Sequence, residues 1–108
     1  MEETPGRKDD AGKPRWDLLP FCALNEVAKV LEFGARKYAP NDWRKVPDWR
    51  ARYVGAALRH VAAFALGERL DPESKLPHLA HAACCVLFML ELDTGEEMVD
   101  GWRTDRNQ

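Results

Sequence analysis

PHLAHAACCVLFMLELD, residues 77–93, has apolar or small side chains on every side of a helix, and it decides the fold. Its polar interruptions are His78, His81 and Glu91. Pro77 suits a first helical turn, because its missing N–H would have no partner there. A helix that is apolar all round is buried at the centre of a protein or in a subunit interface. The stretch therefore predicts a central helix, packed by other helices of this chain or of a second copy.

Two more helices are predicted upstream of this stretch. Residues 21–38 place apolar side chains at steps of three and four on one face, and Val30 and Phe33 lie opposite that face. Residues 49–66 form the second helix, with Asp48 as its N-cap and Gly67 as its end. The apolar face of the first helix comprises Leu24, Val27, Ala28, Leu31, Ala35 and Tyr38.

The organisation of the chain follows from these helices, since no alternating strand pattern and no repeat accompanies them. The fold class is all-α, a small helical bundle of about three main helices with short N- and C-terminal segments. We expect a flexible N-terminal arm at 1–14, an all-α domain at 15–95 and a polar C-terminal tail at 96–108. Three helices seldom cover every apolar face, so a homo-oligomer, a dimer or a tetramer, is expected.

Composition excludes several classes of protein. The chain has 108 residues and is 45% hydrophobic, so it can bury the core of a single domain. Its net charge of -2 argues against a duplex nucleic acid partner. Three cysteines, two of them adjacent, form no disulfide framework and favour a reducing cytoplasm. The N-terminus lacks the apolar segment of a signal peptide, and no apolar run approaches the roughly 20 residues that span a bilayer, so no membrane partner is expected.

Acidic residues and histidines gather in GERLDPESKLPHLAH, residues 67–81. Glu68 and Asp71 have the spacing E-x-x-D, which on a helix puts two carboxylates on one face, where they suit Mg²⁺ or Mn²⁺. Pro72 disfavours a helix at Asp71. Asp71 is therefore also a candidate N-cap of a short turn, with Glu73 balancing the helix dipole, and this role does not exclude metal binding. The candidate metal ligands are Glu68, Asp71, Glu73 and, from the first helix, Glu26.

Histidines lie on both sides of this acidic loop. His60, in an aromatic-rich stripe of the second helix, is either a hydrogen-bonded core residue or part of the site. His78 and His81 share a face at the positive N-terminus of the last helix, where they can help to bind a phosphate. A zinc site with Cys85 is an alternative, although the cysteines fit no common zinc spacing and small cysteines usually pack in a core. The candidate catalytic residues are Glu68, Asp71 and His60.

Residues suited to a nucleotide follow the first helix. Lys37 can meet a phosphate, Asn41 a base edge or a sugar, and Trp43 the face of a base. The alternatives are that Lys37 stabilises the helix C-terminus and that Trp43 fills a corner of the core. The candidate substrate-binding residues are Lys13, Arg15, Asp17, Lys37, Tyr38, Asn41, Trp43, Arg59, His78 and His81.

The motifs KPRWDLLP, EFGARKYAPNDW and ALRHVAAFALGERLDPESKLPHLAHAA follow one another in a match that runs from Lys13 to Asp93. This order resembles the phage and bacterial family named for dATP/dGTP diphosphohydrolase activity, which is similar to the all-α MazG-like nucleoside triphosphate pyrophosphohydrolases. The resemblance implies hydrolysis of a purine dNTP to the monophosphate and pyrophosphate, with divalent metals held by carboxylates. A phage-encoded member would work in the host cytoplasm.

Two departures from the family pattern bear on the metal ligands. MazG-like enzymes pair E-x-x-E on one helix with E-x-x-D on the next, but here Glu26 is followed at i+3 by Lys29, and Glu32 by Ala35. Lys75 stands where the family motif commonly has glycine. The ligands therefore cannot simply be transferred from the MazG pattern. They must be sought among the acids and histidines Glu26, His60, Glu68, Asp71, Glu73, His78 and His81. The rival hypothesis is a non-catalytic helical protein that binds nucleotides or a host protein, but such a protein has no need of acids gathered beside histidines.

Overall fold

The computed structural model describes residues 4–95, and within them every regular element is helical. One isolated antiparallel bridge joins Leu70 to Pro77, and the described residues form no strand. The all-α prediction is confirmed. The elements in chain order are the 3-10 helix η1 at Trp16–Leu18, α1 at Phe21–Lys37, the 3-10 helix η2 at Asp42–Lys45, α2 at Trp49–Ala65 and α3 at His78–Thr94.

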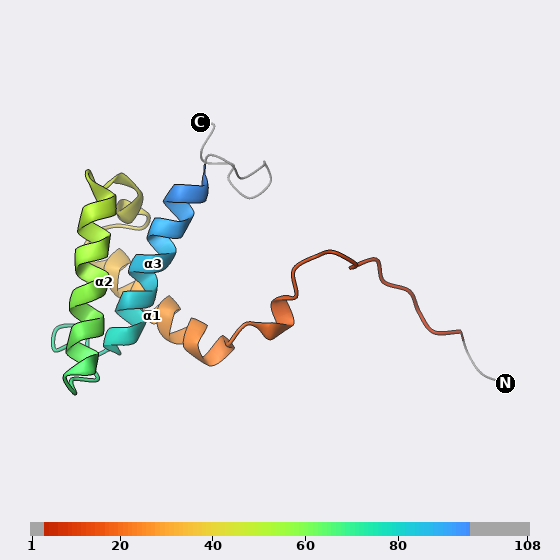
Figure 1. The fold of residues 1–108 in the computed structure, drawn as a ribbon, viewed down its shortest axis with the longest axis horizontal. Coiled ribbons are helices and arrows are strands. Elements are labelled where there is room, and N and C mark those ends of the chain that lie inside the picture. The colour runs from red at the N-terminus through yellow and green to blue at the C-terminus, as the bar shows by residue number, and fades with distance from the viewer. Residues whose placement is uncertain (1–3, 96–108) are drawn as a thin grey trace.

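Helix α3 packs against both α1 and α2, as its all-round apolar character predicted (Figure 1). Val27 and Val30 of α1 meet Ala80 and Cys84 of α3 in the buried cluster. The Cys84 thiol donates a hydrogen bond of 3.6 Å to the carbonyl oxygen of Val27. Small side chains on α3 let α1 come close to it, because interhelical distance depends on the side chains at the contact.

The face that helix α1 turns to this core overlaps the predicted one only in part: Val27, expected within the apolar face, is buried as predicted. Val30, expected opposite the apolar face, is 8% exposed and belongs to the buried cluster. Leu31 and Tyr38, expected within that face, are 41% and 68% exposed. The prediction was wrong for Val30, Leu31 and Tyr38, because α1 carries apolar residues on two sides, and the pattern alone does not say which side meets α3.

Aromatic contacts hold the η2 segment against α3. Trp43 stacks on Phe88, with ring centroids 4.3 Å apart and an interplanar angle of 10°. The Tyr53 ring lies 5.3 Å from that of Phe88, and its hydroxyl donates a hydrogen bond of 2.8 Å to the Trp43 carbonyl oxygen. The segment between α1 and α2 is thereby anchored at the far end of α3 from the acidic loop.

The ends of α2 follow the sequence signals in part. Gly67 has a φ of 102°, in the left-handed region that favours glycine, and ends the helix as predicted. Asp48 is the N-cap residue, but its backbone has the left-handed conformation, and its side chain makes no capping hydrogen bond. Its carbonyl oxygen instead accepts the N–H of Arg52 at 3.2 Å. The start of α2 was therefore placed correctly, while the expected side-chain chemistry is absent.

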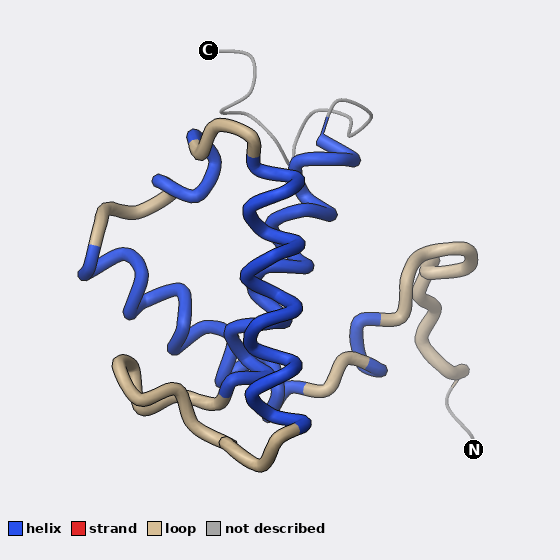
Figure 2. Tube along the Cα trace, turned by 60° about the vertical axis from the view of Figure 1, so that its left-hand side comes forward, coloured by secondary structure: helices blue, strands red, loops and turns tan. Residues whose placement is uncertain are grey.

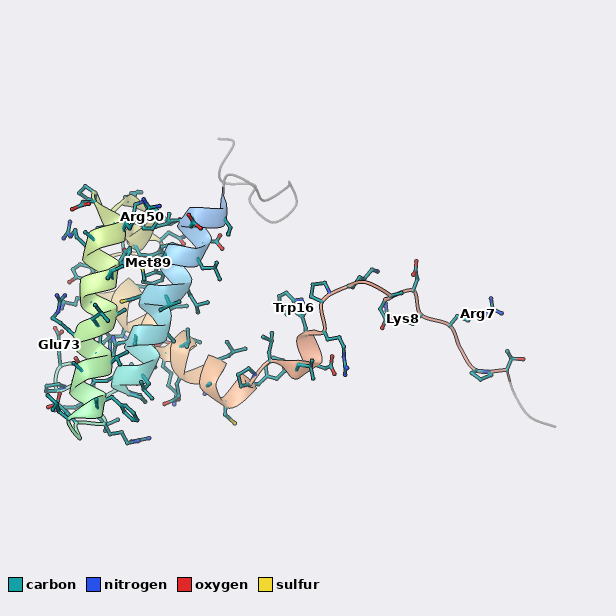
Figure 3. All side chains as sticks on the ribbon, in the orientation of Figure 1. Arg7, Lys8, Trp16, Arg50, Glu73 and Met89 are labelled. Carbon is teal, nitrogen blue, oxygen red and sulfur yellow. The ribbon has the colours of Figure 1, made fainter. Side chains whose placement is uncertain are left out.

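The N-terminal segment runs away from the three helices, as the tube in Figure 2 and the side chains labelled Arg7, Lys8 and Trp16 in Figure 3 show. Residues 4–15 of this segment contain no helix or strand, and all of them are exposed. Trp16, which could have anchored the segment, is 57% exposed. Among the described helices, none is long and apolar enough to cross a bilayer. The predicted tail at 96–108 lies outside the described residues.

Candidate functional site

The loop between α2 and α3 folds back on itself and so brings its two ends together. The Asp71 N–H donates to the Leu76 carbonyl at 2.8 Å, and the His78 N–H donates to the Arg69 carbonyl at 2.9 Å. Lys75 turns the chain with a φ of 64°, a conformation that favours glycine. This reversal places the first turn of α3 beside the acidic residues that precede it.

Asp71 uses its two carboxylate oxygens differently. Oδ1 accepts the backbone N–H groups of Glu73 and Ser74, both at 2.9 Å, so the predicted capping role is confirmed. Oδ2 has no hydrogen-bond donor among the residues that the structure describes. Partial burial alone would raise the pKa of Asp71, but the backbone hydrogen bonds from Ser74 and Glu73 and the nearby histidines lower the pKa overall. The carboxylate is therefore oriented by the loop and ionised at neutral pH.

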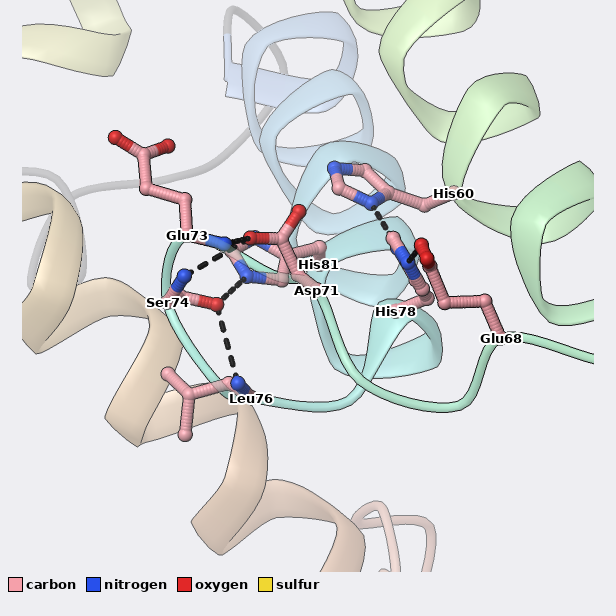
Figure 4. A network of polar contacts seen from close by, with 8 residues as sticks. All are labelled: His60, Glu68, Asp71, Glu73, Ser74, Leu76, His78 and His81. Carbon is pink, nitrogen blue, oxygen red and sulfur yellow. Dashed lines mark hydrogen bonds and ion pairs between the residues drawn. The ribbon is translucent and has the colours of Figure 1, made fainter.

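Three imidazoles pack beside this carboxylate (Figure 4). His60 Nδ1 from α2 lies 2.8 Å from His78 Nδ1, and His78 Nε2 lies 2.5 Å from Glu68 Oε1. The His60 ring stacks on that of His81 at 4.7 Å between centroids. His81 Nε2 in turn contacts Ser74 Oγ at 2.7 Å. Residues from α2, the loop and α3 therefore form one connected polar network.

The surroundings favour neutral imidazoles at His60 and His81. Desolvation is the main cause that lowers the pKa of His60, and repulsion by His81 and His78 lowers it further. Desolvation likewise lowers the pKa of His81, against the opposing charge of Asp71. Because the pKa of each ring is lowered, both rings keep a lone pair at pH 7. This neutral form can accept a proton or bind a metal.

A metal-binding geometry arises from three of these side chains. Ligand atoms of His60, Asp71 and His78 all lie within 4.8 Å of one another. The other candidate acids are engaged elsewhere: Glu26 with Lys29 at 2.8 Å, and Glu73 with Lys37 at 2.8 Å. The ligand atoms that converge in the described residues are therefore those of two imidazoles and one carboxylate, and the set of four carboxylate ligands stays a prediction. Cys85 does not join this group.

An open cleft of about 1650 Å³ borders this cluster. It lies between α1, the η2 segment, α2 and α3, and it is lined by charged as well as apolar side chains. Most of the sequence-predicted site residues meet there, which the periodicity of single helices could not have shown. Those lining the cleft are Lys37, Tyr38, Asn41, Trp43, Arg59, His60, Asp71, Glu73 and His81.

Six predicted site residues lie outside the cleft lining. Glu68 and His78 are not part of the lining. His78 is 5% exposed and both of its ring nitrogens are engaged, so its ring is not open to a phosphate. Glu26 is not part of the lining. The last three, Lys13, Arg15 and Asp17, line a separate hollow on the N-terminal segment. Arg15 and Asp17 form an ion pair of 2.6 Å there.

Two side chains at the cleft already have partners. The Lys37 ammonium binds both oxygens of Glu73, at 2.8 and 3.1 Å, and this hydrogen bond is the main cause that raises the pKa of Lys37. The Trp43 ring has Phe88 stacked on it, and the Arg44 guanidinium lies 4.3 Å from its centroid. The core-corner alternative for Trp43 therefore describes its contacts, and its use as a platform for a base stays a prediction.

Sequence analysis missed Ser74. Its hydroxyl contacts His81 Nε2 at 2.7 Å and accepts the Leu76 N–H at 3.1 Å, and its N–H is capped by Asp71. The signal was available in D-P-E-S, since a serine three residues after an N-cap aspartate sits where its N–H meets the carboxylate. Ser74 thus links the capping turn to the histidines.

Comparisons with known proteins identify the family of the chain. The family model described as dATP/dGTP diphosphohydrolase, N-terminal, matches residues 3–101. A protein of Salmonella phage PMBT28 named dATP/dGTP diphosphohydrolase is 34% identical over 87 residues, which cover 81% of this chain and 29% of that relative. The chain thus spans less than a third of the relative's length. No solved structure matches. By the family match, the chain belongs to the dATP/dGTP diphosphohydrolase family, in the part described as N-terminal.

Proposed function

We propose that this chain hydrolyses the purine deoxynucleoside triphosphates dATP and dGTP to the monophosphate and pyrophosphate, using a divalent metal. The observation that carries the proposal is the convergence of His60, His78 and Asp71 beside a cleft large enough for a nucleotide. Family membership supports the reaction and the purine. Because the relative is much longer than this chain, the activity is proposed for this chain alone and tested on it.

The metal expected from the family is Mg²⁺ or Mn²⁺, and the residues present fit a divalent ion. A carboxylate that is oriented by its loop and neutral imidazoles that face it are suitable ligands, and Mn²⁺ accepts such mixed sets more readily than Mg²⁺. Bound there, the ion would neutralise charge on the phosphate oxygens and activate a water molecule. Lys37 and Arg59 would meet the outer phosphates from the cleft walls.

In the proposed hydrolysis one bond forms at the α-phosphorus and one bond breaks. Water oxygen bonds to the α-phosphorus, the bond from that phosphorus to the α–β bridging oxygen breaks, and pyrophosphate leaves. His81, a neutral imidazole in the cleft that is not among the proposed metal ligands, can accept the proton of the attacking water. Lys37 must exchange its partner Glu73 for a phosphate, which costs little because the pair is exposed.

The test is to incubate the full chain with each of the eight common NTPs and dNTPs in Mn²⁺ or Mg²⁺ and identify the products. We expect pyrophosphate and monophosphate from dATP and dGTP above all. Asp71→Asn should be inactive, while Asp93→Asn, which alters an exposed acid of α3 outside the cleft, should match the wild type. Release of inorganic phosphate together with the nucleoside diphosphate, or no turnover of any nucleotide, would contradict the proposal.

One observation favours a second candidate, a non-catalytic nucleotide-binding module. The chain spans 29% of its relative, so catalysis in that protein could require the remainder. Calorimetric binding of dATP to this chain without any product would select this alternative. Binding of neither dATP nor dGTP would exclude both candidates.

We also propose that the chain acts as a homo-oligomer, at least a dimer. Helices α2 and α3 pack together, yet each keeps large apolar side chains exposed at helical spacing. None of the large side chains in the described residues is less than 2% exposed. A second copy supplies the same stripes in return, as a two-fold interface requires. The exposed stripes are Val54, Leu58 and Val61 on α2 and Leu79, Val86 and Leu90 on α3.

Light scattering at micromolar concentration tests the assembly. A mass of two or more chains is expected, and a mass near the 12.3 kDa of one chain would refute it. Val86→Glu, which puts a charge in the proposed contact, should shift the mass towards a single chain, while Lys29→Glu on α1 should leave it unchanged.

A further inference from the structure

We propose that His60, His78 and Asp71 form a site selective for a transition-metal dication over Mg²⁺, in which His78 binds through Nδ1 and Glu68 orients it from outside. The proposal names the metal of the proposed hydrolase and in that sense rests on it. Its geometric basis, however, is independent of any nucleotide. It also differs from the sequence expectation, in which Glu68 is itself a ligand.

The contact with Glu68 settles where the proton of His78 lies. A carboxylate oxygen only accepts hydrogen bonds at neutral pH, so the 2.5 Å contact requires His78 Nε2 to donate. The imidazole is 5% exposed, and a neutral ring that donates from Nε2 satisfies this contact with a single proton. The remaining nitrogen, Nδ1, is therefore the lone-pair atom, and it faces His60.

The contact between the two Nδ1 atoms has two chemical solutions. Nitrogens 2.8 Å apart repel unless a proton or a cation lies between them. Without metal, the His60 Nδ1–H donates to His78. With metal, both lone pairs point at one ion; a tetrahedral ion with metal–nitrogen bonds of about 2.0–2.1 Å needs nitrogens roughly 3.3 Å apart. An opening of about half an ångström therefore converts the hydrogen bond into a ligand pair.

Asp71 is the third candidate ligand. The three ligand atoms have to draw closer around an ion, because they lie within 4.8 Å of one another, whereas a tetrahedral site needs about 3.3 Å. The Asp71 Oδ1 is held by two backbone N–H groups, which sets the direction of Oδ2. Oδ2 then presents lone pairs that no donor in the described residues uses. Oriented in this way, the carboxylate does not lose side-chain freedom again when an ion binds.

The resulting arrangement is a carboxylate–histidine–metal relay from Glu68 through His78. In such relays the outer carboxylate sets the ring orientation and raises the basicity of the ligating nitrogen. Imidazole ligands suit iron, nickel, copper and zinc, and the affinity of a given site rises from Mn²⁺ through Co²⁺ to Cu²⁺, whereas Mg²⁺ prefers oxygen ligands and keeps its waters. Two nitrogens among three protein ligands therefore favour a transition-metal ion.

Binding is measured on the full chain, stripped with a chelator and free of nucleotide. Calorimetric titration with Mn²⁺, Co²⁺, Zn²⁺ and Mg²⁺ should give one site for each transition ion and an affinity at least tenfold lower for Mg²⁺. The Co²⁺ complex should show visible absorption of an ion with nitrogen ligands, and His60→Gln should change that spectrum. Equal affinity for Mg²⁺ and Mn²⁺, or an unchanged spectrum, would overturn the proposal.

Two acids of the same loop provide a matched comparison for the outer role. Glu68→Gln should weaken Co²⁺ binding by roughly 10- to 100-fold, the usual cost of altering a partner outside the ligand shell. Glu73→Gln removes an acid that pairs with Lys37 and should leave affinity within about twofold. Asp71→Asn removes a ligand and should weaken binding more than Glu68→Gln does.

Equal losses at Glu68 and Glu73, or equal losses at Glu68 and Asp71, would remove Glu68 from the outer role. Circular dichroism of each variant shows whether the helices are retained, and Glu68 is exposed enough for its change to leave the fold intact. Tight Co²⁺ binding without hydrolysis would count against the proposed function alone. Hydrolysis in Mg²⁺ by a chain that binds no Co²⁺ would overturn this inference alone.

Discussion

Replacement of Asp71 separates two roles that one carboxylate combines. Oδ1 caps the N–H groups of Glu73 and Ser74, and Oδ2 faces the histidines. Asn keeps a carbonyl oxygen that can accept both N–H groups but loses the charge. Ala loses both. The pair Asp71→Asn and Asp71→Ala therefore separates the capping contribution to stability from the contribution to the proposed chemistry.

The magnitudes follow from these contacts. Removing a capping side chain costs about 0.5–2 kcal/mol, and two donors lose their acceptor in Asp71→Ala, so we expect a loss of about 1–2 kcal/mol. For a domain of this size that corresponds to a fall in Tm of roughly 5–12 °C. Asp71→Asn should lose less than about 0.5 kcal/mol. Both variants should lose at least about a hundredfold in turnover, since a charged ligand contributes several kcal/mol and 1.4 kcal/mol is a factor of ten.

Urea unfolding followed by circular dichroism measures stability, and pyrophosphate release from dATP in Mn²⁺ measures turnover. The pH dependence gives a further check: because the folded state lowers the pKa of Asp71, its contribution to stability is present above the ordinary pKa of 3.8 and disappears as the pH falls below it. Wild-type turnover in Asp71→Asn would remove this carboxylate from the chemistry. An Asn variant as unstable as the Ala variant would refute the separation of the two oxygens.

Three further predictions test other parts of the structure. Trp43→Ala should destabilise the fold by about 2 kcal/mol or more in urea unfolding. Aromatic-to-alanine changes in cores cost about 3–5 kcal/mol, and this ring is half-buried. A stable variant with a raised KM for dATP would instead support the role of Trp43 as a platform for the base. Since the folded state lowers the pKa of His60 and His81, the unfolded chain gains protons first below pH 6.5, so Tm should fall from pH 7 to pH 5, and His60→Gln should flatten that fall. Burial raises the pKa of Cys84 to about 12, so a thiol reagent at pH 8 should modify the exposed Cys22 quickly and Cys84 only on unfolding; rapid loss of both thiols would contradict the packing of α3.

The fold could be predicted from the sequence where one pattern had one solution. The stretch at 77–93 is apolar on all sides, so the sequence predicted a helix at the centre of the packing. Proline and glycine marked the two ends of that helix. Helix α1 offered two apolar sides, and its buried side is decided by tertiary packing. Val30 meets Cys84, a contact that no local pattern in α1 encodes.

The candidate site divides along the same line. Capping by Asp71 follows from neighbours within three residues, and it was predicted. The meeting of His60 with His78 joins residues 18 apart in sequence across two helices, and it depends on how the loop reverses. Lys75 occupies the left-handed position of that reversal. Glycine, which the family resemblance implied at this position, adopts that backbone conformation more readily than lysine.

A mixed set of histidine and aspartate ligands does not require an E-x-x-E pair on α1, and α1 has none. In the described structure, the one acid of α1 proposed as a ligand, Glu26, pairs with Lys29 and lies outside the cleft lining. The side chain that α2 contributes instead is His60. Exchanging carboxylates for an imidazole lowers the negative charge of the site, which weakens its hold on Mg²⁺ and favours ions that accept nitrogen. A helix without paired glutamates and a loop that orients a histidine are therefore consistent parts of one proposal, and the Glu68 and Glu73 variants test it directly.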